Sequence, residues 1–162
     1  MSEATKLSSE PVSQVKSIRQ LTTFSLGEYK YGIDVMKVQE VTNSLPMTKV
    51  PIAPNYVRGL INLRGQIATA IGLRELFGLG QSQPDTTRMT VICKIDGALL
   101  SLLVDSIGDV IEIPDVDYEP VPDTVQGQIR KFMSGVYKTK EAILSIIDLD
   151  KLNEELNRTS EA

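Results

Sequence analysis

The pattern of apolar and polar residues along the chain predicts a protein built mainly from short β-strands. Residues 88–95 give the clearest example, because apolar and polar residues alternate there and so occupy opposite faces of a strand. One face would carry Met89, Val91, Cys93 and Ile95, and the other Arg88, Thr90 and Lys94. Asp96-Gly97 is a pair typical of two-residue turns, so residues 98–104 are expected to return as the next strand.

Further strands are predicted where short apolar runs are separated by turn residues. The expected strands are residues 20–26, 29–33, 60–63, 67–71, 110–113, 131–137 and 142–147. Two proline-bearing stretches, residues 43–54 and 114–128, are expected to be irregular connections. Turn signals recur about every ten residues, which is typical of small β-barrels rather than of a parallel α/β sheet.

Three short helical segments are expected among the strands. Residues 35–42 carry valines at three-residue spacing and are predicted to form an amphipathic helix, although β-branched valines disfavour one. Residues 73–77 are predicted to form a helical turn that ends at Gly78. The last helix, residues 148–157, is expected to be capped by Asp148 and to dock on the domain through a leucine stripe, namely Leu149, Leu152 and Leu156.

These elements predict a single domain between two flexible tails, residues 1–17 and 158–162. Within residues 18–157, one subdomain is expected at about 20–80 and another at about 88–147, followed by the helix 148–157. Each half supplies four or five strands and has the size of an SH3-like barrel. Such a unit is too small to be stable alone, so the halves are expected to pack together. The predicted fold class is mainly all-β, with two packed SH3-like barrels.

Composition excludes several function classes. The chain has 162 residues, a net charge of −4 and a pI near 4.9, without the basic runs of a nucleic-acid-binding protein. No apolar stretch is long enough for a membrane span, and the N-terminus lacks a signal-peptide core. A single cysteine, Cys93, permits no internal disulfide and is expected to be an inert core residue. These features favour a cytoplasmic protein without direct membrane insertion.

The chain is not expected to be an enzyme. It contains no histidine, which excludes Ser-His and Cys-His triads and removes the commonest metal ligand. No glycine-rich phosphate loop is present, so no cofactor or metal is predicted. A small β-barrel enzyme or ligand carrier is the alternative from another class, and it would need a polar pocket with perturbed titratable groups.

The most informative stretch is NYVRGLINLRGQIATAIGL, residues 55–73, in which two apolar runs flank Arg64-Gly65. This pattern predicts a hairpin with an arginine at its bend, whose planar fork suits a bidentate carboxylate partner. Gly59 indicates a bulge or a close backbone approach within the strand. Asn62 is placed to hydrogen-bond across the turn.

Five ordered motifs resemble the CheW family of coupling proteins over residues 18–157. They are YGIDVMKVQEV at 31–41, VRGLINLRGQI at 57–67, LRELF at 73–77, VDSIGDVIEI at 104–113 and ILSIIDLDKL at 143–152. The resemblance implies two five-stranded barrels without catalytic activity. It also implies an adaptor that couples chemoreceptors (methyl-accepting chemotaxis proteins) to a CheA-type histidine kinase. In the family, a groove near the barrel junction takes the receptor's helical hairpin tip.

The resemblance also implies which residues bind the receptor or the kinase: Val38, Glu40, Gly59, Asn62 and Arg64. Glu40 is expected to lie beside the NLRG turn and to pair with Arg64. For Val38, an inward-facing helical residue and a partner-binding residue remain equal alternatives. The isolated protein is expected to be monomeric and to join receptor arrays at the inner membrane face through its partners.

Two positions depart from the family pattern. Thr69 and Gly72 stand where a proline and an aspartate are usual, and the aspartate would be a good helix N-cap. The changes leave the fold prediction intact but bear on the partner. A CheW-like adaptor in a motility or regulatory pathway other than chemotaxis is therefore kept as an alternative.

Overall fold

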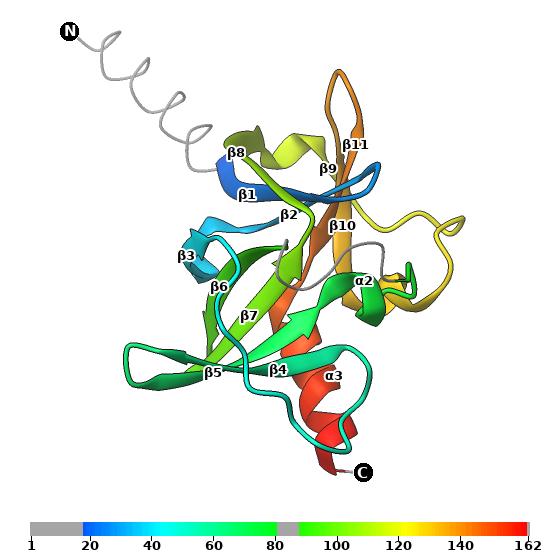
Figure 1. Cartoon of the computed structure of the whole chain (residues 1–162). Helices are drawn as coiled ribbons and strands as arrows, with labels where there is room; N and C mark the ends of the chain where they lie inside the picture. Colours follow the sequence, from blue (N-terminus) through cyan, green and yellow to red (C-terminus); the bar gives the residue numbers. More distant parts are fainter. Residues whose placement is uncertain (1–17, 81–87, 162) are drawn as a thin grey trace, which may run out of the picture.

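The computed structural model describes residues 18–80 and 88–161, with side chains described as far as residue 158. Two β-sheets pack against each other, and the chain ends in a helix at the bottom of the view (Figure 1). Within the described residues, the two sheets contain six and five strands. The mainly β architecture with a C-terminal helix confirms the predicted fold class.

The six-stranded sheet has the strand order β8-β1-β2-β11-β10-β9. Its strands, in chain order, are β1 (Ile18–Leu26), β2 (Tyr29–Asp34), β8 (Ser106–Pro114), β9 (Tyr118–Glu119), β10 (Met133–Lys138) and β11 (Ile143–Ile147). Its two edge strands, β8 and β9, are joined by residues 115–117 alone, and the guanidinium of Arg19 in β1, beside β8, lies 4.8 Å from the ring centre of Tyr118 in β9. The sheet is therefore strongly curled.

The five-stranded sheet has the order β3-β6-β7-β5-β4. Its strands are β3 (Val38–Thr42), β4 (Val57–Leu63), β5 (Gln66–Gly72), β6 (Met89–Ile95) and β7 (Ala98–Val104). Strands β5 and β7 run parallel to each other, whereas the other paired strands in this sheet are antiparallel. Both predicted turns, at residues 64–65 and at residues 96–97, join neighbouring antiparallel strands.

Short helical elements lie between and after the strands. They are η1 (Val35–Lys37), α2 (Leu73–Leu76), η3 (Asp115–Asp117), η4 (Gln128–Phe132) and α3 (Leu149–Glu161). Of these, η1 leads from the six-stranded sheet to the five-stranded one. The predicted helical turn at 73–77 is confirmed as α2, with Phe77 as its C-cap. No helix in the described part of the chain has both the length and the apolar character to cross a membrane.

The sequence predicted one subdomain in each half of the chain. The structure differs, because each sheet takes strands from both halves. Strands β1 and β2 join β8–β11 in the six-stranded sheet, and β6 and β7 join β3–β5 in the other. Parallel pairings between distant strands make this exchange possible, with β11 beside β2 and β7 beside β5. Local turn signals carry no information on such long-range pairings.

Three hydrophobic clusters show how the sheets pack. The largest is shared, because it combines residues of the six-stranded sheet, the five-stranded sheet and α3, for example Phe24, Val91 and Leu152. The curled five-stranded sheet encloses a second cluster that includes Ile61 and Ile92. The six-stranded sheet encloses a third, around Tyr137. Each sheet thus has its own small core and contributes to a common one.

Several predicted elements need correction. Residues 35–42 do not form one helix: a 3-10 turn at 35–37 leads into strand β3, whose backbone pairs with β6. The valines of β3 therefore lie in a strand, which β-branched residues prefer, because β6 supplies hydrogen-bond partners for the backbone. Part of the predicted loop 114–128 forms η3 and the short β9, and β8 begins at Ser106, before the predicted start of that strand. Helix α3 continues to Glu161, into the predicted tail.

Strand β6 is also buried more completely than alternation predicted. Arg88 and Thr90, which the alternation placed on the polar face, are buried, and only Lys94 on that face is exposed. β6 lies inside the sheet between β3 and β7, with one face in the shared core and the other in the core of its own sheet. The predicted tail 1–17 and residues 81–87 lie outside the described residues.

Asp148 caps α3 as predicted, since its side-chain oxygen Oδ1 accepts hydrogen bonds from the backbone N–H groups of Asp150 and Lys151 at 3.0 and 3.2 Å. The leucine stripe docks as expected, with Leu149 and Leu152 buried.

Asp148→Ala should therefore lower the free energy of unfolding by about 1 kcal/mol, measured by urea denaturation. Asp123→Ala, at a fully exposed carboxylate, is the control and should change it by less than about 0.5 kcal/mol. Equal effects would show that the cap does not contribute.

Candidate functional site

The predicted hairpin is present, and Arg64 stands at its bend. Arg64 and Gly65 have φ angles of 50° and 87°, which is the combination of a two-residue turn with both central residues left-handed. The side-chain oxygen of Asn62 accepts a hydrogen bond from the N–H of Gly65 at 3.0 Å, as predicted. A non-glycine residue in this conformation costs about 1 kcal/mol, so the turn holds Arg64 in a strained backbone geometry.

The Arg64 side chain reaches back to β3. Its Nη2 donates a hydrogen bond to Oε1 of Glu40, which confirms the expected ion pair. Strands β3 and β4 are the opposite edges of the five-stranded sheet, so this pair joins edges that the strand order separates. Arg64 is 67% exposed and Glu40 30%, which means that the pair lies at the surface. Its contribution to folding should therefore be below about 1 kcal/mol.

The connection between β3 and β4 packs over Gly59. Thr48 and Leu60 exchange two backbone hydrogen bonds of 2.9 and 2.8 Å, and the register of β4 shifts beside Gly59. A Cβ atom on Gly59 would lie 2.8 Å from the carbonyl oxygen of Thr48 and 3.1 Å from Cβ of Met47. The bulge and the close approach predicted for this glycine are both present. The approaching backbone is the protein's own, and Gly59 is buried beneath it.

Val38 begins β3 and is half-buried, packed against the shared core. Its inward-facing role is therefore confirmed, although in a strand rather than in a helix. Among the predicted site residues, the structure brings Glu40, Asn62 and Arg64 together around one turn. Val38 packs against the shared core and Gly59 lies under Met47 and Thr48, so neither belongs to this exposed group.

Ile67 belongs to the surface around the turn although the sequence pattern only places it in an apolar run. It is 60% exposed and pairs directly with Asn62, so both side chains project from the same face of the hairpin. Alternation could have revealed this, because Ala68 and Ala70 point inward and are fully buried. We refer to the exposed residues Glu40, Asn62, Arg64 and Ile67 as the hairpin surface.

Cys93 is fully buried, and burial raises the pKa of its thiol to about 12. A thiol with so high a pKa is protonated at neutral pH and a poor nucleophile. This agrees with the inert role predicted from its position in β6. In the described ranges, no group of three or more acidic or cysteine side chains is placed to hold a metal ion.

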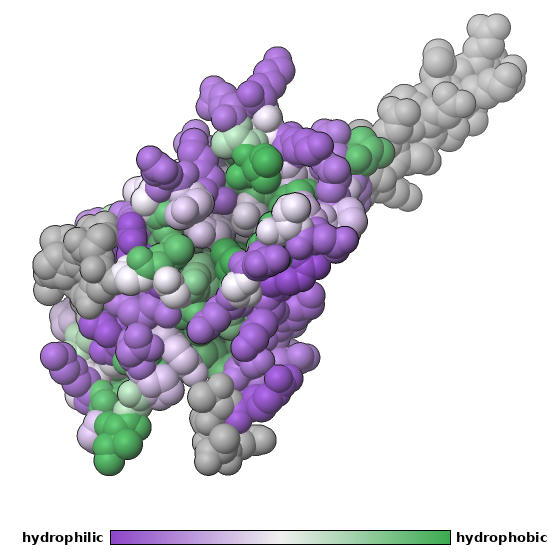
Figure 2. Space-filling view, turned by 90° about the vertical axis from the view of Figure 1, so that its right-hand side faces the viewer, coloured by the Kyte–Doolittle hydropathy of each residue, from purple (hydrophilic) through white to green (hydrophobic). Residues whose placement is uncertain are grey.

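Two of the clefts in the described part of the chain lie beside the six-stranded sheet. One, of about 820 Å³, opens between the start of β1, η1 and the start of α3, and is lined by charged residues such as Asp34 and Asp148. The other, of about 520 Å³, lies between β2, β11 and residues 125–129, with Tyr29 and Ile143 in its lining. Figure 2 shows the face on the right of Figure 1, where hydrophobic side chains form a band bordered by polar ones.

The chain is similar to known proteins over most of its length. The family described as CheW-like domain matches residues 20–156. The chain belongs to this family. The CheW protein of Treponema pallidum is 33% identical to it over 137 residues, covering 82% of this chain and 81% of the relative. The CheW protein of Rhizobium meliloti is 28% identical over 134 residues, covering 83% and 86%. Both relatives are named chemotaxis proteins.

A crystal structure supports the same assignment. The chain is similar to the scaffolding protein TtCheW from Thermoanaerobacter tengcongensis, with a TM-score of 0.74 and 34% sequence identity over 80% of this chain and 88% of the other. The CheW resemblance predicted from five motifs is therefore confirmed. As a member of the CheW family, the protein is a non-catalytic scaffold, and this overturns the alternative of a small barrel enzyme or ligand carrier.

Proposed function

We propose that the protein couples chemoreceptors to a CheA-type histidine kinase in bacterial chemotaxis. The observation that carries this proposal is the Arg64–Glu40 ion pair, which fixes the exposed NLRG turn against β3. A turn held in this way is ordered before a partner arrives, so binding costs less conformational entropy. The names of the relatives favour chemotaxis over another motility or regulatory pathway.

The hairpin surface has the chemistry of a protein-binding site. Ile67 offers an exposed apolar side chain beside the amide of Asn62, and a mixture of this kind is common at protein interfaces. The Arg64 guanidinium carries five N–H donors, and its hydrogen bond to Glu40 leaves others for a partner carboxylate. We therefore assign Glu40, Asn62 and Arg64 to direct partner contact, and Val38 and Gly59 to its support.

An adaptor needs a second surface for its second partner. Receptor and kinase are expected to occupy different parts of the molecule at the same time, and each contact is expected to be micromolar. Repeated weak contacts then build extended arrays through avidity. In the cell, the protein would lie in the cytoplasm, at receptor arrays on the inner membrane face.

Simultaneous binding tests this proposal. The protein is immobilised and exposed to a soluble cytoplasmic fragment of a chemoreceptor and to the regulatory domain of a CheA-type kinase, both from the same organism. We expect each probe to bind with a micromolar Kd and the second to bind undiminished when the first is saturating. Failure of either probe to bind, or competition between them, would contradict the coupling function.

The isolated protein should be monomeric at micromolar concentration, because weak single contacts do not hold a dimer. Sedimentation velocity should give one species near the 17.8 kDa mass of the chain. A tight dimer that persists on dilution would be inconsistent with assembly through partners.

A further inference from the structure

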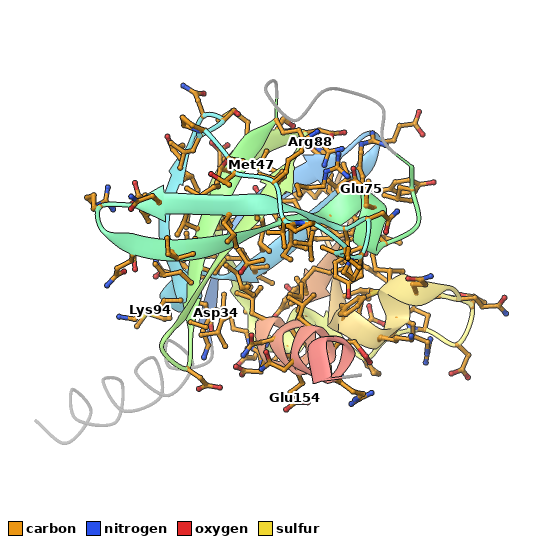
Figure 3. All side chains as sticks on the ribbon, turned by 60° about the horizontal axis from the view of Figure 1, so that its bottom comes forward. Asp34, Met47, Glu75, Arg88, Lys94 and Glu154 are labelled. Carbon is orange, nitrogen blue, oxygen red and sulfur yellow. The ribbon has the colours of Figure 1, made fainter. Side chains whose placement is uncertain are left out.

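A fully buried ion pair lies between α2 and the start of β6. Arg88 donates two hydrogen bonds to the Glu75 carboxylate, Nη1 to Oε1 at 2.9 Å and Nη2 to Oε2 at 2.8 Å. The Arg88 side chain is 0% exposed and that of Glu75 5% exposed. Figure 3 shows the two side chains meeting above α2. A buried pair of this kind is costly to break, because a charge would remain in the protein interior.

The same carboxylate faces a second arginine. Nε of Arg58 lies 3.8 Å from Oε2 of Glu75, and Nη1 of Arg58 donates a hydrogen bond to the backbone oxygen of Asn55 at 2.9 Å. Arg58 directly precedes Gly59, at the point where the register of β4 shifts. A chain of polar contacts therefore runs from Arg88 through Glu75 and Arg58 to the backbone of the segment that enters β4.

Gly72 leaves the space that the Glu75 carboxylate fills. A Cβ atom on Gly72 would lie 2.3 Å from Oε1 of Glu75 and 2.9 Å from Nη1 of Arg88. The backbone N–H of Gly72 also donates to the carbonyl oxygen of Tyr56 at 2.8 Å, which holds α2 close to the same segment. Absence of a side chain at residue 72 is thus a condition for the position of Glu75.

We propose that Glu75 is a positioning residue for the hairpin surface. Held by Arg88, its carboxylate fixes Arg58, and Arg58 fixes residues 55–59. The position of this segment determines how closely Gly59 approaches Thr48 and Met47. This contact in turn positions the start of the hairpin. This inference rests on the proposed function, because it assigns Glu75 a role in presenting the partner surface.

The electrostatics agree with a charged Glu75. Burial raises the pKa of its carboxyl, but the hydrogen bonds from Arg88 and from its own backbone N–H, and the charges of Arg88 and Arg58, outweigh it. The net pKa lies below the ordinary value of a glutamate. The carboxylate is therefore ionised at neutral pH and can bind both arginines.

A matched pair on the same helix provides the control. Arg74, the neighbour of Glu75, donates hydrogen bonds of 2.7–3.0 Å from Nε and Nη2 to Asp105, and both side chains are nearly buried. Asp105 also accepts from the backbone N–H of Gly27, in the turn between β1 and β2. Breaking this pair therefore destabilises α2 from the side of the six-stranded sheet, away from the segment that enters β4.

The experiment compares Glu75→Gln with Asp105→Asn by amide hydrogen exchange in the free protein, well below Tm. Both variants should lower Tm, by about 10 °C for Glu75→Gln. Only Glu75→Gln should speed exchange at the Thr48 and Leu60 amides by tenfold or more. It should also weaken binding of a soluble chemoreceptor fragment about tenfold, whereas Asp105→Asn should leave the affinity unchanged. Similar exchange in the two variants, or faster exchange with undiminished affinity, would overturn the inference.

Arg58→Met keeps the experiment decisive if Glu75→Gln does not fold. It leaves the Arg88–Glu75 pair intact and preserves much of the side-chain volume, but removes the link to Asn55. The same faster exchange at Thr48 and Leu60 is expected, with a smaller loss of Tm, and unchanged exchange would refute the role of the chain of contacts. If the wild-type protein does not bind the fragment, the proposed function fails, and the exchange data alone decide whether Glu75 positions the segment.

Discussion

Arg64→Glu should leave the protein folded and lower its affinity for the chemoreceptor fragment by tenfold or more, equivalent to at least about 1.4 kcal/mol. Two effects act in the same direction. The ion pair with Glu40 is replaced by repulsion between two carboxylates, which releases the NLRG turn from β3. The reversed charge also repels a partner carboxylate. Titration calorimetry measures the affinity, and circular dichroism verifies the fold.

Arg158→Glu is the matched control, because Arg158 is similarly exposed, at 74%, and pairs with Glu155 on α3. It should leave the affinity unchanged. The double exchange Glu40→Arg with Arg64→Glu should recover part of the affinity if the intramolecular pair is what the surface requires. No recovery, with both single variants folded, would indicate that Arg64 contacts a partner carboxylate directly. Full affinity in Arg64→Ala would remove Arg64 from the site.

Gly59→Asp should reduce both stability and binding. Its Cβ would overlap the backbone carbonyl of Thr48, which cannot rotate away as a side chain would. The segment must then move off β4 and break both hydrogen bonds between Thr48 and Leu60, and a charge is buried as well. We expect a loss of about 3 kcal/mol in the free energy of unfolding and at least tenfold weaker receptor binding.

Gly97→Asp separates this steric effect from the effect of added charge. Gly97 lies at the exposed turn between β6 and β7, where a Cβ atom would have no neighbour within 4 Å, although the φ of 82° disfavours a side chain. A cost of about 1 kcal/mol and an unchanged affinity are expected. Gly59→Ala should resemble Gly59→Asp in direction, because it shares the Cβ overlap. If Gly59→Ala matched wild type in urea denaturation and in binding, the close approach of Thr48 to Gly59 would contribute neither to stability nor to binding.

Local signals in the sequence were sufficient for the hairpins and for the cap of α3. Asp96-Gly97 and Arg64-Gly65 both form two-residue turns, since glycine accepts the left-handed conformation that such turns require. The ion pair between Glu40 and Arg64 is different. It joins residues from opposite edges of a sheet, so only the family resemblance could suggest it, and no periodicity indicates it.

Burial of charge was beyond the reach of the sequence. Alternation placed Arg88 on the polar face of its strand, and an isolated strand pattern cannot tell that both faces of β6 are covered. Gly72 departs from the family's usual aspartate, but the consequence of this change is visible only in three dimensions. In the structure, the Glu75 carboxylate occupies the space where a side chain at residue 72 would begin.

The four-residue helix α2 carries two neighbouring side chains that tie it in opposite directions. Arg74 is bound to the turn of the six-stranded sheet through Asp105, and Glu75 is bound to the five-stranded sheet through Arg88. Movement of α2 away from either contact would break one of these pairs. In the proposed receptor array, two sheets joined through α2 would move as one body. A signal would then cross the protein by displacement of the whole molecule rather than by bending within it.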